Sequence, residues 1–583
     1  MLSASPSALL ASRVLLIALA FGLSAPALAA GTAPLPLPAH ATPTVAETPA
    51  EPPLRPDVAP PPRPMVWIDW HGDLRMRAER LSGVRLFFPT SPVGAPARLD
   101  LQHSTDEKGY GSDGVMATAD LRLRFDPVLH VGEWFEVRGQ FDLAQGLVMG
   151  GNSDVRLAGS GYDSVEMFTS QSGQGPVPGG IQVRRLWLHA RLFGLAELDI
   201  GRQPDHFGMG MLRNSGGDML GDFQSDVDRV SLRGELFGLR LMLARDSLSA
   251  FPSQPSGTSS GISDAAIVSG GAAVQTGTGA VQYPLEDATD VTRYVLQVEG
   301  GKPGQERGLE WGAALLWTTQ TLGSALEHDT TTDLKTKLAT DSCFSEGTCV
   351  GLVPRNASFL TPQVALDWRT AGLGHKLRLQ AEGVFLYGTI GQTDVLTQTS
   401  SAKTLVSGGL AARGTWSLDR SDVILDTGFA SGESEGGFGV NDTNNFTRKV
   451  DDSQRSLLTG FHFHRNFRID GILFRDVIGA VANAVYFKPA YRYHLLGGPA
   501  SSEALSVEGS VVTAIAASAA ATPGGGSLLG VEPGLDIAYR QGPRSGGMLR
   551  GSVLLPGGAF DDPITHASAH TAWRLEAVWR LAF

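Results

Sequence analysis

The densest group of charged side chains lies in a glycine-rich stretch, residues 201–230. Carboxylates on a connection that folds into a pore, facing arginines on the pore wall, would narrow the pore and set its local potential. The sequence therefore predicts a constriction built from aspartates of this stretch and arginines of neighbouring segments. Its expected members are Asp218, Asp222, Asp226 and Asp228 opposite Arg122, Arg124 and Arg185. The alternative is a solvated surface loop, since charged glycine-rich loops are common on protein surfaces.

Other chemistry is sparse in the sequence. Cys343 and Cys349 are the only two cysteines, and in an exported protein a local disulfide between them is expected. Several carboxylates in 201–230 could hold calcium, but their spacing is not that of an EF-hand. His462 and His464 alternate on a strand-like run and indicate a polar face. No nucleophile elbow, phosphate-binding loop or zinc-hydrolase motif occurs, so we predict no enzyme, no cofactor and no metal site.

The last eleven residues, 573–583, alternate with a period of two, which is typical of a β-strand. One face carries Trp573, Trp579 and Phe583, and the other carries charged residues such as Arg574 and Glu576. An unpaired strand with an apolar face invites aggregation unless it is covered. A closed barrel facing lipid meets that need, because a membrane strand needs about 9–11 residues and carries aromatics at the interfaces. The alternative is a buried strand of a β-sandwich.

Similar alternating runs follow one another from residue 66 onward, joined by short and long connections in turn. The string Leu-Phe-Gly-Leu closes two tight hairpins, at residues 192–195 and 236–239, which indicates an internal repeat. Long polar stretches separate the hairpins. Counting the runs predicts an all-β fold: a transmembrane, antiparallel, up-and-down β-barrel of about 18 strands, with short periplasmic turns and long extracellular loops.

The two faces of these strands differ sharply. One face is apolar, as at Leu74 and Met76 or Leu121 and Leu123, and we expect it to face lipid. The opposite face carries charges, of which the expected inward residues include Arg75, Arg77, Arg122, Arg124, Glu136, Arg138, Arg185, Arg229, Arg233, Arg378 and Glu382. A water-filled lumen tolerates such a row, whereas a protein core would not bury it unpaired. At this strand number the interior needs a channel or an inserted plug, and no separate plug domain is visible in the sequence.

The two segments before the barrel indicate an exported protein. Residues 1–29 resemble a secretory signal peptide, with one arginine, an apolar stretch and a small-x-small cleavage pattern. Residues 30–64 contain twelve of the 34 prolines and predict an extended periplasmic linker without a core. Residues 65–583 form the barrel, with both termini periplasmic. With 47 basic against 59 acidic residues, a nucleic-acid partner is not expected.

Three blocks resemble a known family: residues 201–230, residues 471–494 with Asn-Ala-Val-Tyr-Phe-Lys-Pro, and the final hairpins from 534. They look like segments of an uncharacterised family of predicted outer-membrane barrels of myxobacteria. More distantly, the last hairpins look like alginate-export-type porins, whose lumen is strongly basic, whereas the wall here is mixed. In general porins the third extracellular loop narrows the channel, and residues 201–230 hold the third long connection here. The terminal aromatic resembles the C-terminal signal read by the outer-membrane barrel assembly machinery.

We therefore expect a porin-like channel in the cell outer membrane, for diffusion or export of small polar or saccharide solutes, with outer-membrane lipid around it. Two alternatives remain open at this point. One is a non-conducting barrel whose loops serve adhesion or surface structure, and the other is a secreted soluble all-β protein.

Overall fold

The structure is a computed structural model that describes most of the chain from residue 65 onward. The described residues are 65–83, 115–143, 147–148, 181–248, 267–269, 272–274, 291–301, 304–320, 323–325, 350–353, 356–372, 375–391, 402–433, 457–497, 501, 503–561 and 568–583. The predicted signal peptide, the predicted linker, Cys343 and Cys349 lie outside these residues.

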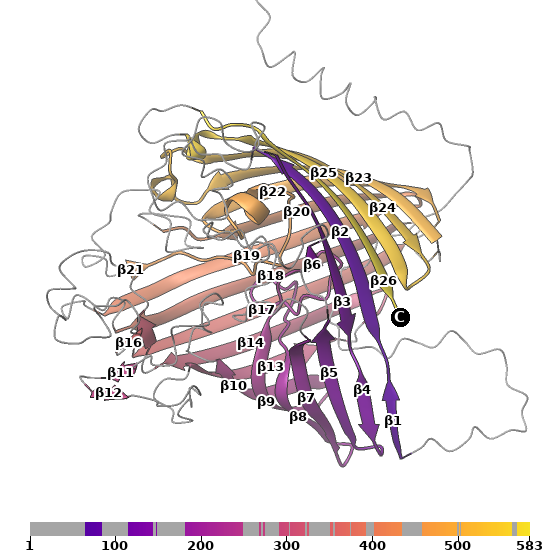
Figure 1. The fold of residues 1–583 in the computed structure, drawn as a ribbon, viewed down its shortest axis with the longest axis vertical. Coiled ribbons are helices and arrows are strands. Elements are labelled where there is room, and N and C mark those ends of the chain that lie inside the picture. Colours follow the sequence, from indigo (N-terminus) through magenta and orange to yellow (C-terminus); the bar gives the residue numbers. More distant parts are fainter. Residues whose placement is uncertain are drawn as a thin grey trace, which may run out of the picture.

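A closed antiparallel barrel of 18 strands dominates the fold, which confirms the predicted fold class (Figure 1). Three strands are each built from two consecutive segments: β1 (Val66–Asp69) with β2 (Gly72–Ser82), β3 (Val115–Phe125) with β4 (Val128–Val131), and β5 (Phe135–Asp142) with β6 (Leu147–Val148). The other fifteen are β7 (Gln182–Leu192), β8 (Ala196–Pro204), β9 (Asp226–Leu236), β10 (Leu239–Leu248), β13 (Val291–Gly300), β14 (Gly308–Gln320), β17 (Ala357–Gly372), β18 (His375–Ile390), β19 (Lys403–Ser417), β20 (Ser421–Ala430), β22 (Ala484–Leu496), β23 (Glu503–Ala516), β24 (Leu528–Gln541), β25 (Ser545–Pro556) and β26 (Ala572–Ala582).

Short connections gather at one end of the barrel and long ones at the other, which we call the short end and the long end. The two repeated Leu-Phe-Gly-Leu strings form short-end turns, where Phe193 and Phe237 adopt positive φ. The described chain starts its first strand at the short end, because Val66 pairs with Val131 beside the turn after β4, and Phe583 ends there too. Minor elements lie in the long connections: β11 (Ile267–Ser269), β12 (Ala272–Val274), β15 (Gly323–Ala325), β16 (Val350–Val353), β21 (Leu457–Leu458), η2 (Leu473–Val477), η3 (Ala519–Ala521) and η4 (Gly558–Phe560).

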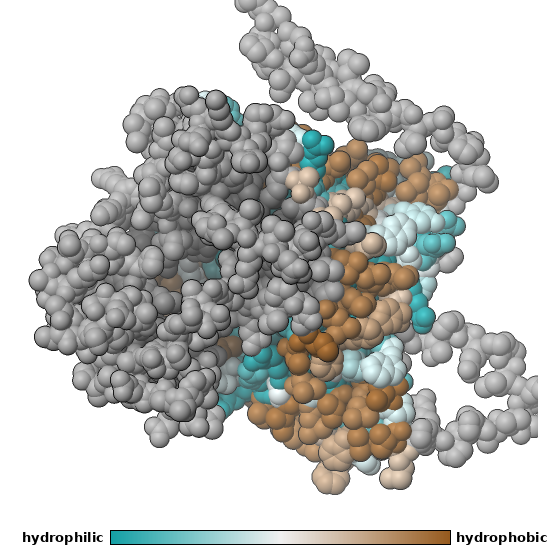
Figure 2. All heavy atoms as spheres, viewed as in Figure 1, coloured by the Kyte–Doolittle hydropathy of each residue, from teal (hydrophilic) through white to brown (hydrophobic). Residues whose placement is uncertain are grey.

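Alternation along each strand puts apolar side chains outside and charges inside, as the sequence predicts. Met76 is 43% exposed on the outer face of β2, whereas its neighbours Arg75 and Arg77 are each 4% exposed and point inward. The same division runs around the barrel, and Figure 2 shows the apolar residues spread across its outer surface. No helix among the described residues is long and apolar enough to cross a bilayer.

The barrel closes where β26 pairs with β2 over ten residues of each strand, from Asp73 opposite Ala582 to Ser82 opposite Trp573. Phe583 extends this ladder through two backbone hydrogen bonds with Gly72, and its ring meets Phe125 edge-on with centroids 5.4 Å apart. Glycine is required opposite this ring, since a Cβ at Gly72 would lie 2.5 Å from it. At the junction of the first and last strands, an aromatic ring therefore packs over a glycine.

Replacing Phe583 with Asp removes the ring from the Gly72 and Phe125 contacts and places a carboxylate on the apolar outer face. We expect the folded, heat-modifiable form of the protein in cell envelopes to fall several-fold, while Phe583→Tyr, the matched control, keeps wild-type levels. Semi-native gel electrophoresis of envelope fractions measures both. Wild-type amounts of the folded Asp variant would mean that the terminal aromatic is not needed for closure or assembly.

Candidate functional site

Parts of two long connections fold back into the barrel. The third connection comprises residues 205–225 between β8 and β9, and of the seventh, between β20 and β22, the structure describes 431–433 and 457–483. Within the seventh, we call residues 457–483 the plug segment. Residues of both connections bond to inward-facing side chains of the wall, so the functional site is built from loops as well as from the wall.

A buried arginine fixes the base of the third connection. Arg213 donates to Asp205 at 3.0 Å, to Gln297 of β13 at 2.9 Å and to Gln363 of β17 at 3.0 Å, and its guanidinium lies 4.8 Å from the ring centre of Phe207. Each polar side chain in this set is buried, so every bond replaces one that water would otherwise make. The connection is therefore locked to one side of the wall.

Asp205 gathers three arginines at the start of this connection. Its carboxylate lies 3.0 Å from Arg213, 3.1 Å from Arg229 and 2.6 Å from Arg293. Burial alone would raise the pKa of Asp205, but these guanidinium groups outweigh it and hold the pKa well below its ordinary value. Asp205 is therefore charged across the physiological pH range. Its charge holds together the three arginines at the base of the third connection.

Glu382 of β18, the strand next to β17, holds the next turn from the same side of the wall. One carboxylate oxygen accepts the backbone N–H groups of Met209 and Met211, at 2.7 and 3.1 Å. The turn requires glycine, because Gly208 and Gly210 have positive φ and a Cβ at Gly208 would lie 2.8 Å from Glu382. Beside it, Phe207 packs into a small apolar cluster on the inner faces of β10, β13, β14 and β17.

Asp222 anchors the tip of the third connection to β2. Its carboxylate receives two bonds from Arg77, at 2.7 and 2.8 Å, and lies 3.0 Å from Arg75. The preceding carbonyl, of Gly221, accepts from Arg75 and from Arg122, each at 2.9 Å. Burial would raise the pKa of Asp222, but Arg77, Arg468 and Arg75 hold it well below its ordinary value.

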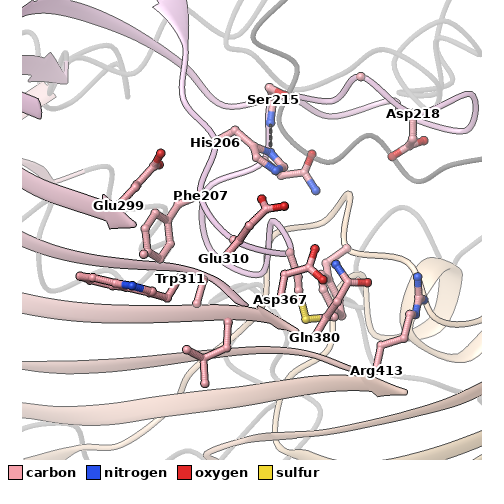
Figure 3. Close-up of a pocket in the computed structure, with 18 of the residues that line it drawn as sticks. His206, Phe207, Ser215, Asp218, Glu299, Glu310, Trp311, Asp367, Gln380 and Arg413 are labelled. Carbon is pink, nitrogen blue, oxygen red and sulfur yellow. Dashed lines mark hydrogen bonds between the residues drawn. The ribbon is translucent and has the colours of Figure 1, made fainter. Parts of the chain in front are cut away.

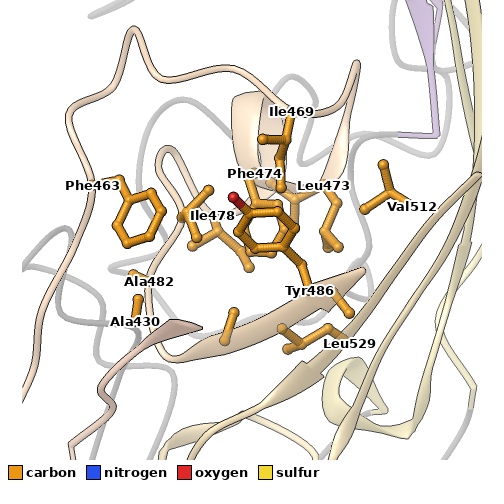
Figure 4. Packing of buried hydrophobic residues seen from close by; sticks show 14 of the residues in the cluster. Ala430, Phe463, Ile469, Leu473, Phe474, Ile478, Ala482, Tyr486, Val512 and Leu529 are labelled. Atoms are coloured by element: carbon orange, nitrogen blue, oxygen red, sulfur yellow. The ribbon is translucent and has the colours of Figure 1, made fainter. Parts of the chain in front are cut away.

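The plug segment carries its own apolar core against the wall of β19 to β26. Figure 4 shows Tyr486 of β22 pointing among Phe463, Leu473, Phe474 and Ile478 of the plug segment. Phe474 and Phe463 each meet the Tyr486 ring at an angle, with centroids 6.3 and 6.5 Å apart. Because these apolar side chains are buried between plug and wall, they help to hold the segment inside the barrel.

Polar anchors fix the η2 turn of the plug segment. Glu532 of β24 accepts the backbone N–H groups of Gly471 at 2.7 Å, Ile472 at 3.1 Å and Leu473 at 2.9 Å, and Asp470 accepts that of Phe474. These are donors that a helix start leaves without internal partners.

Salt bridges tie the same turn to β2 and β26, the two strands that close the barrel. Arg475 bridges Glu576 of β26 at 2.7 Å and Glu79 of β2 at 3.0 Å. Arg574 of β26 reaches Asp476 and Glu79 at 2.5 and 2.7 Å. The plug segment therefore binds, from inside the barrel, to the junction where the first and last strands pair.

The two connections also meet each other. His464 donates its backbone N–H to the Met211 carbonyl at 2.6 Å, and Asn466 donates to Asp218 at 2.6 Å. Arg468 donates to Asp222 at 2.5 Å. We call this set of contacts the seam. Burial, with repulsion from His462 and Arg465, lowers the pKa of His464 to about 4, so its imidazole is neutral here.

Polar cavities lie on both sides of the third connection. The long-end cavity has a volume of about 550 Å³, and its lining includes Arg184, Arg213 and Arg293. The short-end cavity, about 130 Å³, lies between the third connection, the wall and Arg468. Figure 3 shows Glu310, Asp367 and Arg413 of the wall reaching toward its centre, with His206 and Asp218 on the other side.

The structure distributes the predicted constriction residues over several environments. Asp222 and Asp226 lie inside the barrel, where Asp226 pairs with Arg185 at 2.5 Å. Arg122 meets the third connection through the Gly221 carbonyl, whereas Arg124 pairs with Asp142 of β5. Asp218 contacts Asn466 across the seam. Asp228 does not contact the other members: near the long end it pairs with half-exposed Arg202 at 2.8 Å, and both residues contribute to the lining of the long-end cavity.

Several residues that organise the site were not among the predicted ones. Arg213 and Glu382 hold the third connection, and Arg468 and Arg475 come from the plug segment, which the sequence analysis did not recognise as an inward loop. Alternation on β9 sets Asp228 out of phase with inward Arg229, although Asp226, which has the same phase as Asp228, pairs with Arg185. No comparable sequence signal marks Arg468.

No three histidine, cysteine or carboxylate side chains in the described part of the chain are placed to hold a metal ion together. This includes the acidic third connection, whose aspartates are engaged by arginines and by Asn466. The predicted role of Trp573, Trp579 and Phe583 in assembly stays a prediction, although all three lie on the outer face of the closing strand.

No protein-family model and no curated protein matches this sequence. Among solved structures, the chain is similar to the outer-membrane protein OpdK from Pseudomonas aeruginosa, with 12% identity and a TM-score of 0.39 over 88% of this chain and 99% of that one. OccK9 (OpdG) from the same organism gives 14% and 0.42 over 88% and 99%. OmpT from Vibrio cholerae gives 10% and 0.33 over 89% and 98%. These likenesses are distant and assign no solute or role to this chain.

The first prediction from this site concerns Arg213. Replacing Arg213 with Met removes three buried hydrogen bonds and one partner of Asp205, so opening of the third connection should become easier by about 3–5 kcal/mol. Hydrogen exchange at the Met209 and Met211 amides measures this opening. Arg202→Met, which breaks a half-exposed pair, is the control and should change exchange by no more than about 1 kcal/mol. Equal effects of the two substitutions would contradict the assigned lock.

The second concerns Asp470 in the plug segment. Burial, and then the nearby Glu532 carboxylate, raise the pKa of Asp470 from 3.8 to about 8. A carboxyl with a raised folded-state pKa gives stability that is present below pH 3.8 and is lost as the pH rises toward about 8. Asp470→Asn keeps an acceptor for Phe474, so it should melt higher than wild type at pH 8 and match it below about pH 4. Melting curves across pH test this, and a constant difference between the two would refute it.

Proposed function

We propose that this protein is a porin-like channel of the cell outer membrane, for diffusion or export of small polar or saccharide solutes. The observation that carries the proposal is the third connection, which folds across the lumen between polar cavities of about 550 and 130 Å³. The apolar outer face supports the membrane part of it, since large apolar side chains such as Trp317, 49% exposed, cover the outside of the strands. A soluble all-β protein would not leave such a surface in water.

Orientation follows from the asymmetry of connections. In bacterial barrels the short turns are periplasmic and the long ones extracellular. The short end, which holds Val66 and Phe583, would therefore face the periplasm, and the 550 Å³ cavity would open toward the outside. A periplasmic C-terminal strand fits the proposed recognition by the barrel assembly machinery.

The charge arrangement favours polar solutes without strong charge selection. Carboxylates and guanidinium groups alternate along the wall and are mostly paired, as in Arg124 with Asp142 or Arg550 with Asp536. Paired groups keep lone pairs and N–H donors that hydroxyl groups can use. A saccharide-sized solute would exchange its hydration for these contacts.

A non-conducting barrel is the second candidate, and one observation favours it. The third connection and the plug segment contact the wall on both halves of the barrel and meet at the seam. If these contacts persist in the membrane, they leave little open cross-section. The barrel would then serve surface structure or adhesion through its long connections.

Single-channel recording in planar bilayers separates the two candidates. We expect wild type to conduct, and replacing residues 211–223 with a short Gly-Ser linker should raise conductance at least two-fold, because this deletion widens the lumen. In the same assay, Asp226→Asn should shift selectivity toward anions at low salt. Wild type and the deletion variant both failing to conduct would reject the channel in favour of a structural barrel.

A further inference from the structure

Four guanidinium groups surround the Asp222 carboxylate. Arg75 and Arg77 reach it from the wall, and Arg468 and Arg475 reach it from the plug segment, at distances from 2.5 to 3.9 Å. Two separate parts of the chain, β2 and the plug segment, thus converge on one carboxylate of the third connection. Charge-assisted bonds of this kind are short and strong, and a planar two-oxygen anion suits the arginine fork.

Counting the charges around Asp222 shows what its carboxylate does. Arg75 and Arg77 share Asp120, Arg77 and Arg475 share Glu79, and Arg475 also meets Glu576. Arg574, which shares the last two, is matched by Asp476. Without Asp222 the cluster therefore holds one more guanidinium than carboxylates. A buried excess charge is costly, so the cluster demands one anion.

Arg468 is the member left short of partners. Among the described residues its ion pair is with Asp222 alone, through Nη2. Its Nε and Nη1 are buried and have no hydrogen-bond partner. Arg468 also lines the 130 Å³ short-end cavity together with Asp218 and Asn466. A guanidinium with unused donors therefore borders a cavity large enough for a small organic molecule.

We propose that the Asp222 carboxylate occupies, from within the chain, a binding site for the carboxylate group of a small organic anion that reaches Arg468 from the short-end cavity. The anion and Asp222 compete for the same guanidinium groups. When the anion is bound, Asp222 loses its contact with Arg468 and the tip of the third connection is released from the plug segment. The same guanidinium group of Arg468 thus binds the solute and joins the plug segment to the third connection.

This inference deepens the proposed function by naming a solute class, and it rests on that function only for the route by which the anion arrives. Binding itself needs no conduction. A test based on stability therefore distinguishes a failure of the site from a failure of the channel.

The experiment uses formate as the probe and the full chain folded in detergent. Asp222→Ala removes the carboxyl group and leaves a space of formate size beside the uncompensated guanidinium. We expect this variant to melt lower than wild type, and sodium formate to recover at least half of the loss when compared with sodium chloride at equal ionic strength. Formamide, which has nearly the same size as formate but no charge, should recover none.

Two controls decide whether the recovery comes from this site. Asp228→Ala, at an aspartate that does not contact this group, should not respond to formate, and the double variant Asp222→Ala with Arg468→Gln should lose the recovery. If Asp222→Ala does not fold without the anion, the same variant is refolded with and without formate, and the folded yield replaces the melting temperature. Equal effects of formate and formamide, or recovery that survives Arg468→Gln, would overturn the proposal. A barrel that shows the recovery but never conducts would reject the channel and leave the site standing.

Discussion

The need to pair charges inside a closed barrel governs the rest of this structure. Strand alternation sends Arg75 and Arg77 inward because their neighbours Leu74 and Met76 form the apolar outer face. Once connections fold into the lumen and displace water, each of those charges requires a partner or it becomes very costly. Carboxylates of the third connection and the plug segment meet part of that need, so the same ion pairs that satisfy the wall also fix the loops.

Two kinds of interaction divide the work between the inward connections. The third connection is held chiefly by ion pairs and hydrogen bonds, through Arg213, Glu382 and Asp222. The plug segment has an apolar core around Tyr486 and adds polar anchors at η2. Since apolar contacts weaken little with salt whereas ion pairs respond to competing ions, the third connection is the part that an anionic solute can move. The two connections meet at the seam, so a solute that moves the third connection changes its contacts with the plug segment.

Sequence patterns were sufficient for the barrel and insufficient for the partners within it. Period-two alternation predicts the facing of Arg75, Arg122 and Glu382, and the connection lengths predict the strand count. Pairing inside the lumen depends on long-range geometry: Asp222 and Arg468 are 246 residues apart, and Arg124 is claimed by Asp142 on a nearby strand. The plug segment was missed because alternating residues such as Phe461 and Phe463 read equally as a lipid-facing strand or as a loop core.

Cross-linking the two connections across the seam tests the central claim most directly. The His464 N–H to Met211 carbonyl bond implies Cα atoms within disulfide range, so Met211→Cys with His464→Cys should link in intact outer membranes after Cys343 and Cys349 are changed to Ser. We predict the linked peptide, seen by mass spectrometry, as efficiently as in the wall control Ala244→Cys with Val295→Cys, whose positions are paired on neighbouring strands. A linked wall pair with no link between residues 211 and 464 would mean that the two connections do not meet in the membrane.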